Sequence, residues 1–183
     1  MSEHSSLVMQ VHLSQEQWTR YLASEIGAVQ RFGDWGELID PARLNEVQYG
    51  DLRTVNDWLE QFGANDQVIN APSSSLDVDW AHGCVNCVVF FYSEDPVEFV
   101  RDLNVLRSVA HHKDSSDADF IVIYPHFWRA DDVDAAVTLA AGESRLLNKE
   151  TDHALIRSLA WRAETILEAH KTPLREMAER DDA

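Results

Sequence analysis

The chain has 183 residues, 45% of them apolar, which is enough to bury the core of one folded domain. Its 32 Asp and Glu outnumber its 15 Lys and Arg, for a net charge of -17. Because an acidic surface repels phosphate backbones, we expect no direct binding to nucleic acid. The sequence has neither a run of about 18 apolar residues nor a signal-peptide pattern, so we expect a cytoplasmic protein that does not enter a membrane.

The N-terminal part of the sequence predicts one strand followed by helices. Residues 7–13 largely alternate apolar and polar side chains, as a strand does. Ser14 and Gln17 form a capping-box pattern, which predicts a helix over residues 14–32 with Glu25 inside its apolar arc. The next predicted elements are a helix at 41–47 capped by Asp40, a helix at 52–62 capped by Asp51, and a strand near 67–71.

The middle of the chain predicts a hairpin and a crossover. Residues 76–80 and 84–92 are two strand patterns separated by a short turn, which indicates a hairpin. An Asp-Pro pair opens a helix over 95–112, and the wholly apolar run 120–124 indicates a central strand. The order strand, helix, strand predicts a βαβ crossover.

The C-terminal third predicts helices at 130–141 and 150–170, the second ending before Pro173. We expect one domain over residues 1–172 and a frayed or disordered acidic tail over 173–183. The predicted fold class is α/β, or α+β: a central mixed sheet of about four to five strands, packed by amphipathic helices.

Cys84 and Cys87 form a Cys-x-x-Cys motif at the start of a predicted strand. A structural zinc site needs four converging ligands, which His82 and one of His111 and His112 would have to complete. Side chains alternate along a strand, so His82 and Cys84 are expected on one face and Cys87 on the other. A redox motif belongs at a helix N-terminus, and this one begins a strand. We therefore interpret both cysteines as packing residues.

Other polar residues have a structural explanation beside a functional one. His111 and His112 end a predicted helix, where the helix dipole favours a protonated imidazole in solvent. Tyr124, His126 and Trp128 follow a central strand, at the position where α/β proteins often bind small molecules, although a packed loop histidine explains the same pattern.

Three carboxylates, Asp131, Asp132 and Asp134, could bind a divalent ion or act as acid and base. They also occupy the first turn of a predicted helix, where negative charge is stabilising without a further role. Trp161 lies on the charged side of the helix at 150–170, opposite its apolar stripe. Such a tryptophan is either covered by another segment or anchors an interface.

The function that fits these patterns is non-enzymatic binding to another protein with a basic or mixed surface, as an inhibitor, an immunity protein or an assembly or regulatory factor. Binding residues are then expected among Trp161, Trp128, His126, Asp131, Asp132 and Asp134. The alternative is a metal-binding protein or metal-dependent enzyme that holds zinc with His82, Cys84, Cys87 and His111 or His112.

Overall fold

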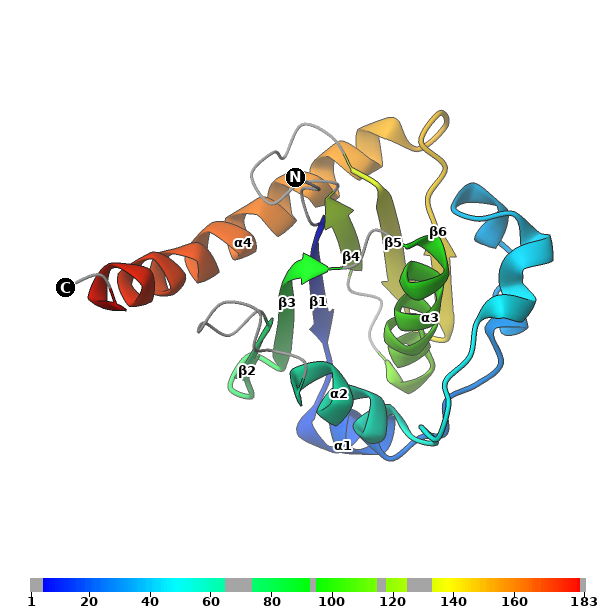
Figure 1. Ribbon diagram of the computed structural model, residues 1–183, viewed down its shortest axis with the longest axis horizontal. Helices are drawn as coiled ribbons and strands as arrows, with labels where there is room; N and C mark the ends of the chain where they lie inside the picture. The colour runs from blue at the N-terminus through cyan, green and yellow to red at the C-terminus, as the bar shows by residue number, and fades with distance from the viewer. Residues whose placement is uncertain (1–4, 65–73, 93–94, 115–117, 125–132, 182–183) are drawn as a thin grey trace.

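The computed structural model describes residues 5–64, 74–92, 95–114, 118–124 and 133–181. A six-stranded sheet in the order β2-β3-β1-β4-β5-β6 is covered by helices on both faces (Figure 1). The strands are β1 (Ser5–His12), β2 (Ser74–Asp79), β3 (Cys84–Tyr92), β4 (Asp119–Tyr124), β5 (Ala135–Ala140) and β6 (Glu143–Leu146). The α-helices are α1 (Gln15–Leu22), α2 (Val55–Ala64), α3 (Pro96–Arg107) and α4 (His153–Asp181), and the 3-10 helices are η1 (Val29–Arg31), η2 (Trp35–Glu37), η3 (Pro41–Glu46) and η4 (Ser108–His112).

The predicted α/β class is confirmed, with six strands in place of four or five. Neighbouring strands of the described sheet pair antiparallel throughout, although the sequence pattern predicts a mixed sheet. β3 and β4 each lie antiparallel to β1, so they run parallel to one another and α3 joins them as the predicted crossover. Because β1 lies between them, the two parallel strands do not touch.

Alternation along β1 divides its side chains between two cores. Leu7, Met9 and Val11 point to the face that α1, α2 and α3 cover, and Val8 points to the face that α4 covers. All four side chains are buried, which explains why β1 carries apolar residues at consecutive positions.

The first helix is shorter than its pattern predicts. α1 begins at the predicted capping box and ends at Leu22. The Ser24 hydroxyl donates to the Tyr21 carbonyl, and the backbone after Ser24 pairs with residues 53–55, so both interactions replace helical hydrogen bonds. Glu25 is exposed in this bridge and needs no buried partner.

Of the two helix caps predicted at Asp40 and Asp51, the structure has only the first. Asp40 caps η3, as predicted. α2 begins at Val55 and not after Asp51, because Thr54 and Asp57 satisfy each other's backbone N–H groups. Thr54 N donates to Asp57 Oδ2 at 2.8 Å, and Asp57 N donates to Thr54 Oγ1 at 3.1 Å.

Residues 135–146 form a hairpin, so the helix predicted over 130–141 is wrong for the part that the structure describes. The turn passes through Gly142, whose φ of 74° lies in the left-handed region that glycine adopts without strain. β5 is largely buried beside β4, and pairing in the sheet overrides the helix propensity of its alanines and leucine.

α4 covers the second face of the sheet with the predicted apolar stripe. Leu159, Ala163 and Leu167 are buried in the core that contains Val122. The helix continues past Pro173 to Asp181, and its C-terminal part extends beyond the sheet (Figure 1). A proline removes one intrahelical hydrogen bond but does not always end a helix. None of the helices in the described ranges has both the length and the apolar character of a membrane span.

A fully buried arginine fastens the irregular segment before α2 to the sheet. Arg107 Nη2 donates to Asp34 Oδ2 at 2.7 Å and to the Ser144 carbonyl at 3.0 Å. Its guanidinium also lies over the rings of Phe32 and Trp35, with centroid distances of 4.1 and 4.6 Å. One side chain therefore joins α3, the η1–η2 segment and β6.

Replacing Arg107 with alanine is expected to lower the free energy of unfolding by about 3 kcal/mol, because it removes the partner of Asp34 and leaves a gap beneath two aromatic rings. The matched control is Arg145→Ala, which breaks an exposed ion pair with Asp152 and is expected to cost about 0.5 kcal/mol or less. Urea unfolding followed by circular dichroism compares the two variants. Equal losses would contradict the special role of Arg107.

Candidate functional site

Trp161 has the largest exposed fraction, 70%, among the large apolar side chains of the described residues. It projects from α4 on the side opposite the buried stripe, as the sequence predicts. Arg157, Glu164 and Glu168 lie one or two turns away on the same side. A tryptophan in this setting is typical of a residue that a partner covers.

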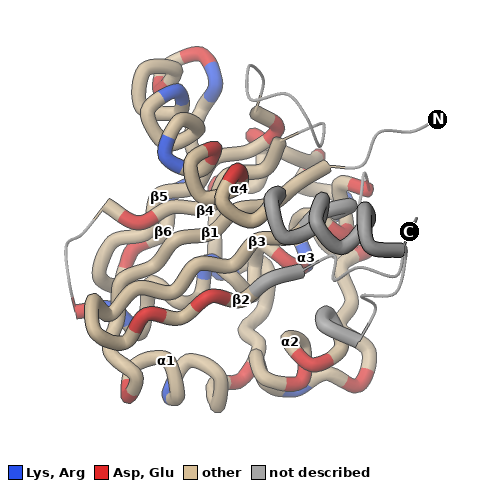
Figure 2. Tube along the Cα trace, turned by 90° about the vertical axis from the view of Figure 1, so that its left-hand side faces the viewer, with Lys and Arg blue, Asp and Glu red and all other residues tan. Residues whose placement is uncertain are grey.

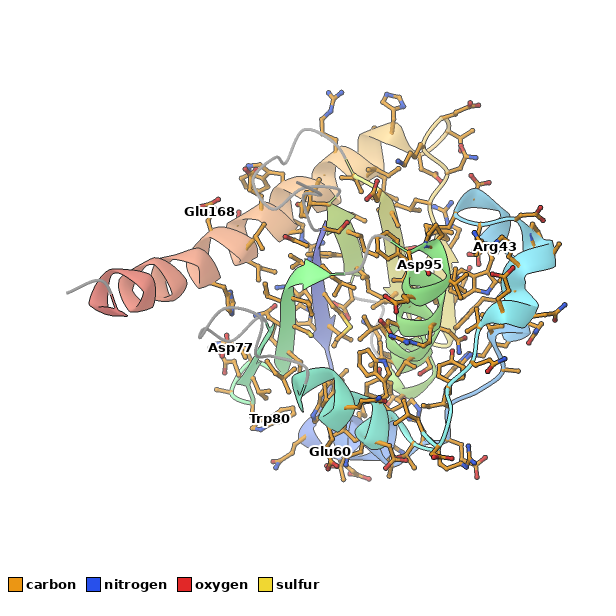
Figure 3. All side chains as sticks on the ribbon, viewed as in Figure 1. Arg43, Glu60, Asp77, Trp80, Asp95 and Glu168 are labelled. Atoms are coloured by element: carbon orange, nitrogen blue, oxygen red, sulfur yellow. The ribbon has the colours of Figure 1, made fainter. Side chains whose placement is uncertain are left out.

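The edge strand β2 and the turn after it form a second exposed surface. Leu76 is 42% exposed and Trp80 is 39% exposed. Asp77 and Asp79 are exposed on the opposite side of the strand, because side chains alternate along it. Figure 3 shows Asp77, Trp80 and Glu60 along one margin of the molecule, and Figure 2, which views the molecule from this side, shows acidic positions along β2.

Short-range contacts hold the turn between β2 and β3. Asp79 Oδ1 accepts from Ala81 N at 3.0 Å, and Asp79 Oδ2 lies 2.6 Å from His82 Nδ1. The His82 hydrogen bond holds the pKa of Asp79 below its usual range. Gly83 adopts a φ of 61°, and its carbonyl accepts from Leu13 N at 2.8 Å. The end of the hairpin is therefore tied to the segment that joins β1 and α1.

The two cysteines lie on opposite faces of β3, as strand alternation predicts. Cys87 is buried in the core beneath α1 and α2, and this burial raises the pKa of its thiol to about 12. Cys84 is half-buried on the side of α4. Its pKa is also raised, first by burial and then by the carboxylates of Asp79 and Asp77. Both environments disfavour a thiolate, so neither cysteine has the setting of a reactive nucleophile.

The described residues do not assemble the suggested zinc site. His82 lies in an exposed turn, Cys84 and Cys87 point to opposite faces, and His111 and His112 belong to η4 on the face that holds Cys87. In the described ranges, no three His, Cys, Asp or Glu side chains gather where they could hold a metal ion. The suggested zinc site is therefore wrong for these residues, because strand alternation places Cys84 and Cys87 on opposite faces of the sheet.

His111 and His112 pack against aromatic rings. The His111 ring is stacked on Phe32 with centroids 6.3 Å apart, and the His112 ring lies 5.7 Å from that of Tyr21. Burial lowers the pKa of both histidines, and the charge of Arg31 lowers it further. His111 is exposed, as predicted for a solvated helix end, but desolvation and nearby cations oppose the protonation that the helix dipole favours.

A buried ionic cluster lies where β1 ends and β4 begins. The Asp119 carboxylate accepts from His12 N at 2.8 Å, lies 2.6 Å from His12 Nδ1 and forms an ion pair with buried Lys113. His12 pairs with Cys84 across β1 and β3, so a thiol, an imidazole and a carboxylate follow one another across the sheet. The same groups serve nucleophilic cysteines, but the raised pKa of Cys84 opposes that use. We interpret the cluster as a structural connection between strand ends.

Sequence reasoning did not single out this cluster. Two signals were available: Asp119 directly precedes an apolar strand pattern, and Lys113 is one of three lysines in the chain. Asp119 and Lys113 come close to His12 only because β1 pairs with β4, and His12 and Asp119 are 107 residues apart. Local sequence patterns do not predict such a long-range pairing.

Several predicted site residues lie outside the described part of the chain: His126, Trp128, Asp131 and Asp132. Tyr124, which precedes them, is buried, and its hydroxyl donates to the Ala160 carbonyl at 2.6 Å. Asp134 is half-buried directly before β5, and not in the first turn of a helix. Tyr124 therefore anchors α4 to the sheet.

A small cavity lies between α1, α2 and the β2–β3 side of the sheet. Its volume is about 10 Å³, and apolar side chains line it, among them Trp18, Trp58 and Leu76. This volume accommodates about one water molecule. It is far too small for a cofactor or a substrate.

The cysteine environments predict an order of thiol reactivity. Iodoacetamide at pH 7 is expected to leave Cys87 unmodified in the folded protein and to modify Cys84 more slowly than free glutathione, because both pKa values are raised. Peptide mass spectrometry after timed labelling measures this, and labelling in urea is the control in which both thiols react. Modification of folded Cys84 faster than glutathione would contradict the prediction and restore a case for thiol chemistry.

The lowered histidine pKa values predict that stability falls with acidification. As the pH decreases through about 6.5, the unfolded chain binds protons at His111 and His112 that the folded chain does not bind, so the free energy of unfolding falls. Urea unfolding at pH 7.5, 6.5 and 5.5 is expected to show this loss, and the double variant His111→Gln/His112→Gln is expected to reduce the slope. His153→Gln, at an exposed position of α4, is the control. An unchanged slope in the double variant would mean that other groups cause the loss.

Comparison of the chain with protein-family models, curated proteins and solved structures found no match. Its function is therefore inferred from its own residues. Two surfaces carry exposed apolar side chains beside charged ones: the side of α4 with Trp161, and the margin formed by β2 and Trp80.

Proposed function

We propose that the protein acts by binding another protein, with Trp161 as an anchor of the interface. The observation that carries this proposal is the 70% exposure of Trp161 on a charged side of α4. In the free protein this large apolar surface is in contact with water, and a partner that covers it gains the free energy of its burial. Tryptophans surrounded by polar residues are enriched among the side chains that dominate binding energy.

The charge of the chain indicates the kind of partner. A net charge of -17 attracts a basic or mixed surface and accelerates the encounter at low ionic strength. Arg157 beside Glu164 and Glu168 provides groups of both signs around Trp161, which favours a partner with a mixed surface there. Inhibitors, immunity proteins and assembly or regulatory factors are the classes of protein that fit this description.

A non-enzymatic role is part of the proposal. Cys84 is the possible nucleophile, because His12 lies beside it on β1 and Asp119 contacts His12 from β4. The pKa of the Cys84 thiol is nevertheless raised. This raised pKa supports binding over thiol catalysis.

The test is substitution of Trp161. Partners are captured with the full chain from the cells that express it, and the affinity of the purified partner is measured by calorimetry for the natural chain and for Trp161→Ala. The variant is expected to bind at least about 30-fold more weakly, which corresponds to about 2 kcal/mol. Binding of the natural chain is also expected to weaken as sodium chloride rises from about 50 to 500 mM.

The matched control is Leu155→Ala, which removes a second large exposed apolar side chain from the part of α4 whose side chains are described. Leu155 lies about 120° around the helix from Trp161, so its loss is expected to change the affinity less than about threefold. Circular dichroism and urea unfolding establish that both variants fold. If Trp161→Ala binds every captured partner as tightly as the natural chain, Trp161 is not an interface anchor.

A further inference from the structure

β2 lies at one edge of the sheet and pairs with β3 on its inner side. In an antiparallel ladder, successive residues direct their backbone N–H and C=O groups to opposite sides of the strand. Leu13 N donates to the Gly83 carbonyl, which continues the β1–β3 ladder. The odd-numbered residues of β3 therefore direct their backbone N–H and C=O groups to β1, and the even-numbered residues direct theirs to β2. Asp77 pairs with Asn86, and its backbone groups therefore face β3.

The same alternation turns the backbone groups of Leu76 and Val78 away from the sheet. Each offers one N–H and one C=O along the outer edge of β2. The side chain of Leu76 is 42% exposed on one side of this edge, and the carboxylate of Asp77 is exposed on the other. Within the described strands, the edge thus combines backbone N–H and C=O groups that point away from β3, an apolar surface and negative charge.

We propose that this edge binds an extended segment of a partner protein in which basic residues alternate with apolar residues. The segment lies beside β2 as an added strand and exchanges backbone hydrogen bonds with Leu76 and Val78. Its apolar side chains cover Leu76 and approach Trp80, whereas its basic side chains lie on the side of Asp77. This inference goes beyond the proposed function, because it concerns a separate surface and does not depend on Trp161.

The geometry of the ladder sets the charge requirement. Since the outward hydrogen bonds belong to Leu76 and Val78, the residue opposite Asp77 forms a non-hydrogen-bonded pair, in which Cα atoms approach to about 4.5 Å. Opposite charges in such a pair stabilise the added strand, and like charges destabilise it. A lysine or arginine is therefore favoured opposite Asp77.

A second copy of this chain is a poor occupant for the same reason. Antiparallel pairing of two β2 strands would place Asp77 and Asp79 of one copy near the same residues of the other, and each copy carries a net charge of -17. Acidic side chains on an edge strand prevent such self-pairing. The edge is also held in place before binding, since the turn at its end is tied to Leu13, so little ordering is needed.

The probe for the test is a seven-residue peptide, blocked at both ends, in which lysine alternates with valine. Titrated into the full ¹⁵N-labelled chain, it is expected to bind saturably and to slow hydrogen exchange at the amides of Leu76 and Val78. A peptide of the same composition, with its lysines and valines in two separate blocks, is expected to bind at least about fivefold more weakly, because it cannot match charge and backbone together. Equal binding of both peptides, or exchange that is unchanged at Leu76 and Val78, would overturn the proposal.

Variants at the edge separate backbone pairing from general attraction. Leu76→Pro removes one outward N–H and is tolerated on an edge, so it is expected to weaken peptide binding at least about fivefold, whereas Leu76→Val keeps the N–H and most of the affinity. Asp77→Lys is expected to reverse the preference toward a peptide in which glutamate alternates with valine. Unchanged binding in Leu76→Pro, or an unreversed preference in Asp77→Lys, would show that the peptide binds elsewhere.

Trp161→Ala is the control that separates the two proposals. It is expected to bind the alternating peptide as the natural chain does, because Trp161 lies on α4 and not on the β2 edge. A loss of peptide binding in Trp161→Ala equal to that in Leu76→Pro would contradict the separate edge site. Loss of a natural partner in Trp161→Ala, with peptide binding intact, leaves the edge proposal standing.

Discussion

The fold depends on β1 being hydrogen-bonded on both sides and buried on both faces. β1 joins the β2–β3 hairpin to the β4–β5–β6 meander, and these two parts of the sheet meet through it. Its odd-numbered residues enter the core beneath α1, α2 and α3, while Val8 enters the core beneath α4. A strand in this position disfavours polar residues in its centre, and those of β1 lie toward its two ends: Ser5 and Ser6 at the start, and Gln10 and His12, which bond to Asn86 and Asp119, toward the finish.

Because β1 and its neighbours form the core, the surfaces that can contact other molecules lie at the periphery, on α4 and β2. α4 covers one face, but only its inner stripe is used for packing, so its outer side presents Trp161. β2 lies two strands away from β1, at the edge of the sheet, and its outer edge presents Leu76 and Asp77. Because both surfaces are attached to a buried framework, binding there requires little rearrangement of the chain.

Local patterns predicted the features that depend on neighbours in sequence. The capping box at Ser14, the helix start at Asp95, the β2–β3 hairpin, the opposite faces of the two cysteines and the position of Trp161 opposite the apolar stripe of α4 are all set within a few residues or by strand and helix periods. Features set by distant segments were missed. β5 is a strand because it lies beside β4, and the pKa values of the η4 histidines fall because η1 and α1 pack on them.

β1 precedes in sequence both strands that pair with it, and this order has a consequence during synthesis. Gln10 finds its partner Asn86 after 76 residues, and His12 meets Asp119 after 107. At about 5–20 residues per second, the ribosome needs on the order of 5–20 seconds to supply the second of these partners. During that interval β1 lacks one of its two strand neighbours, so its apolar side chains depend on being shielded from aggregation until β4 emerges.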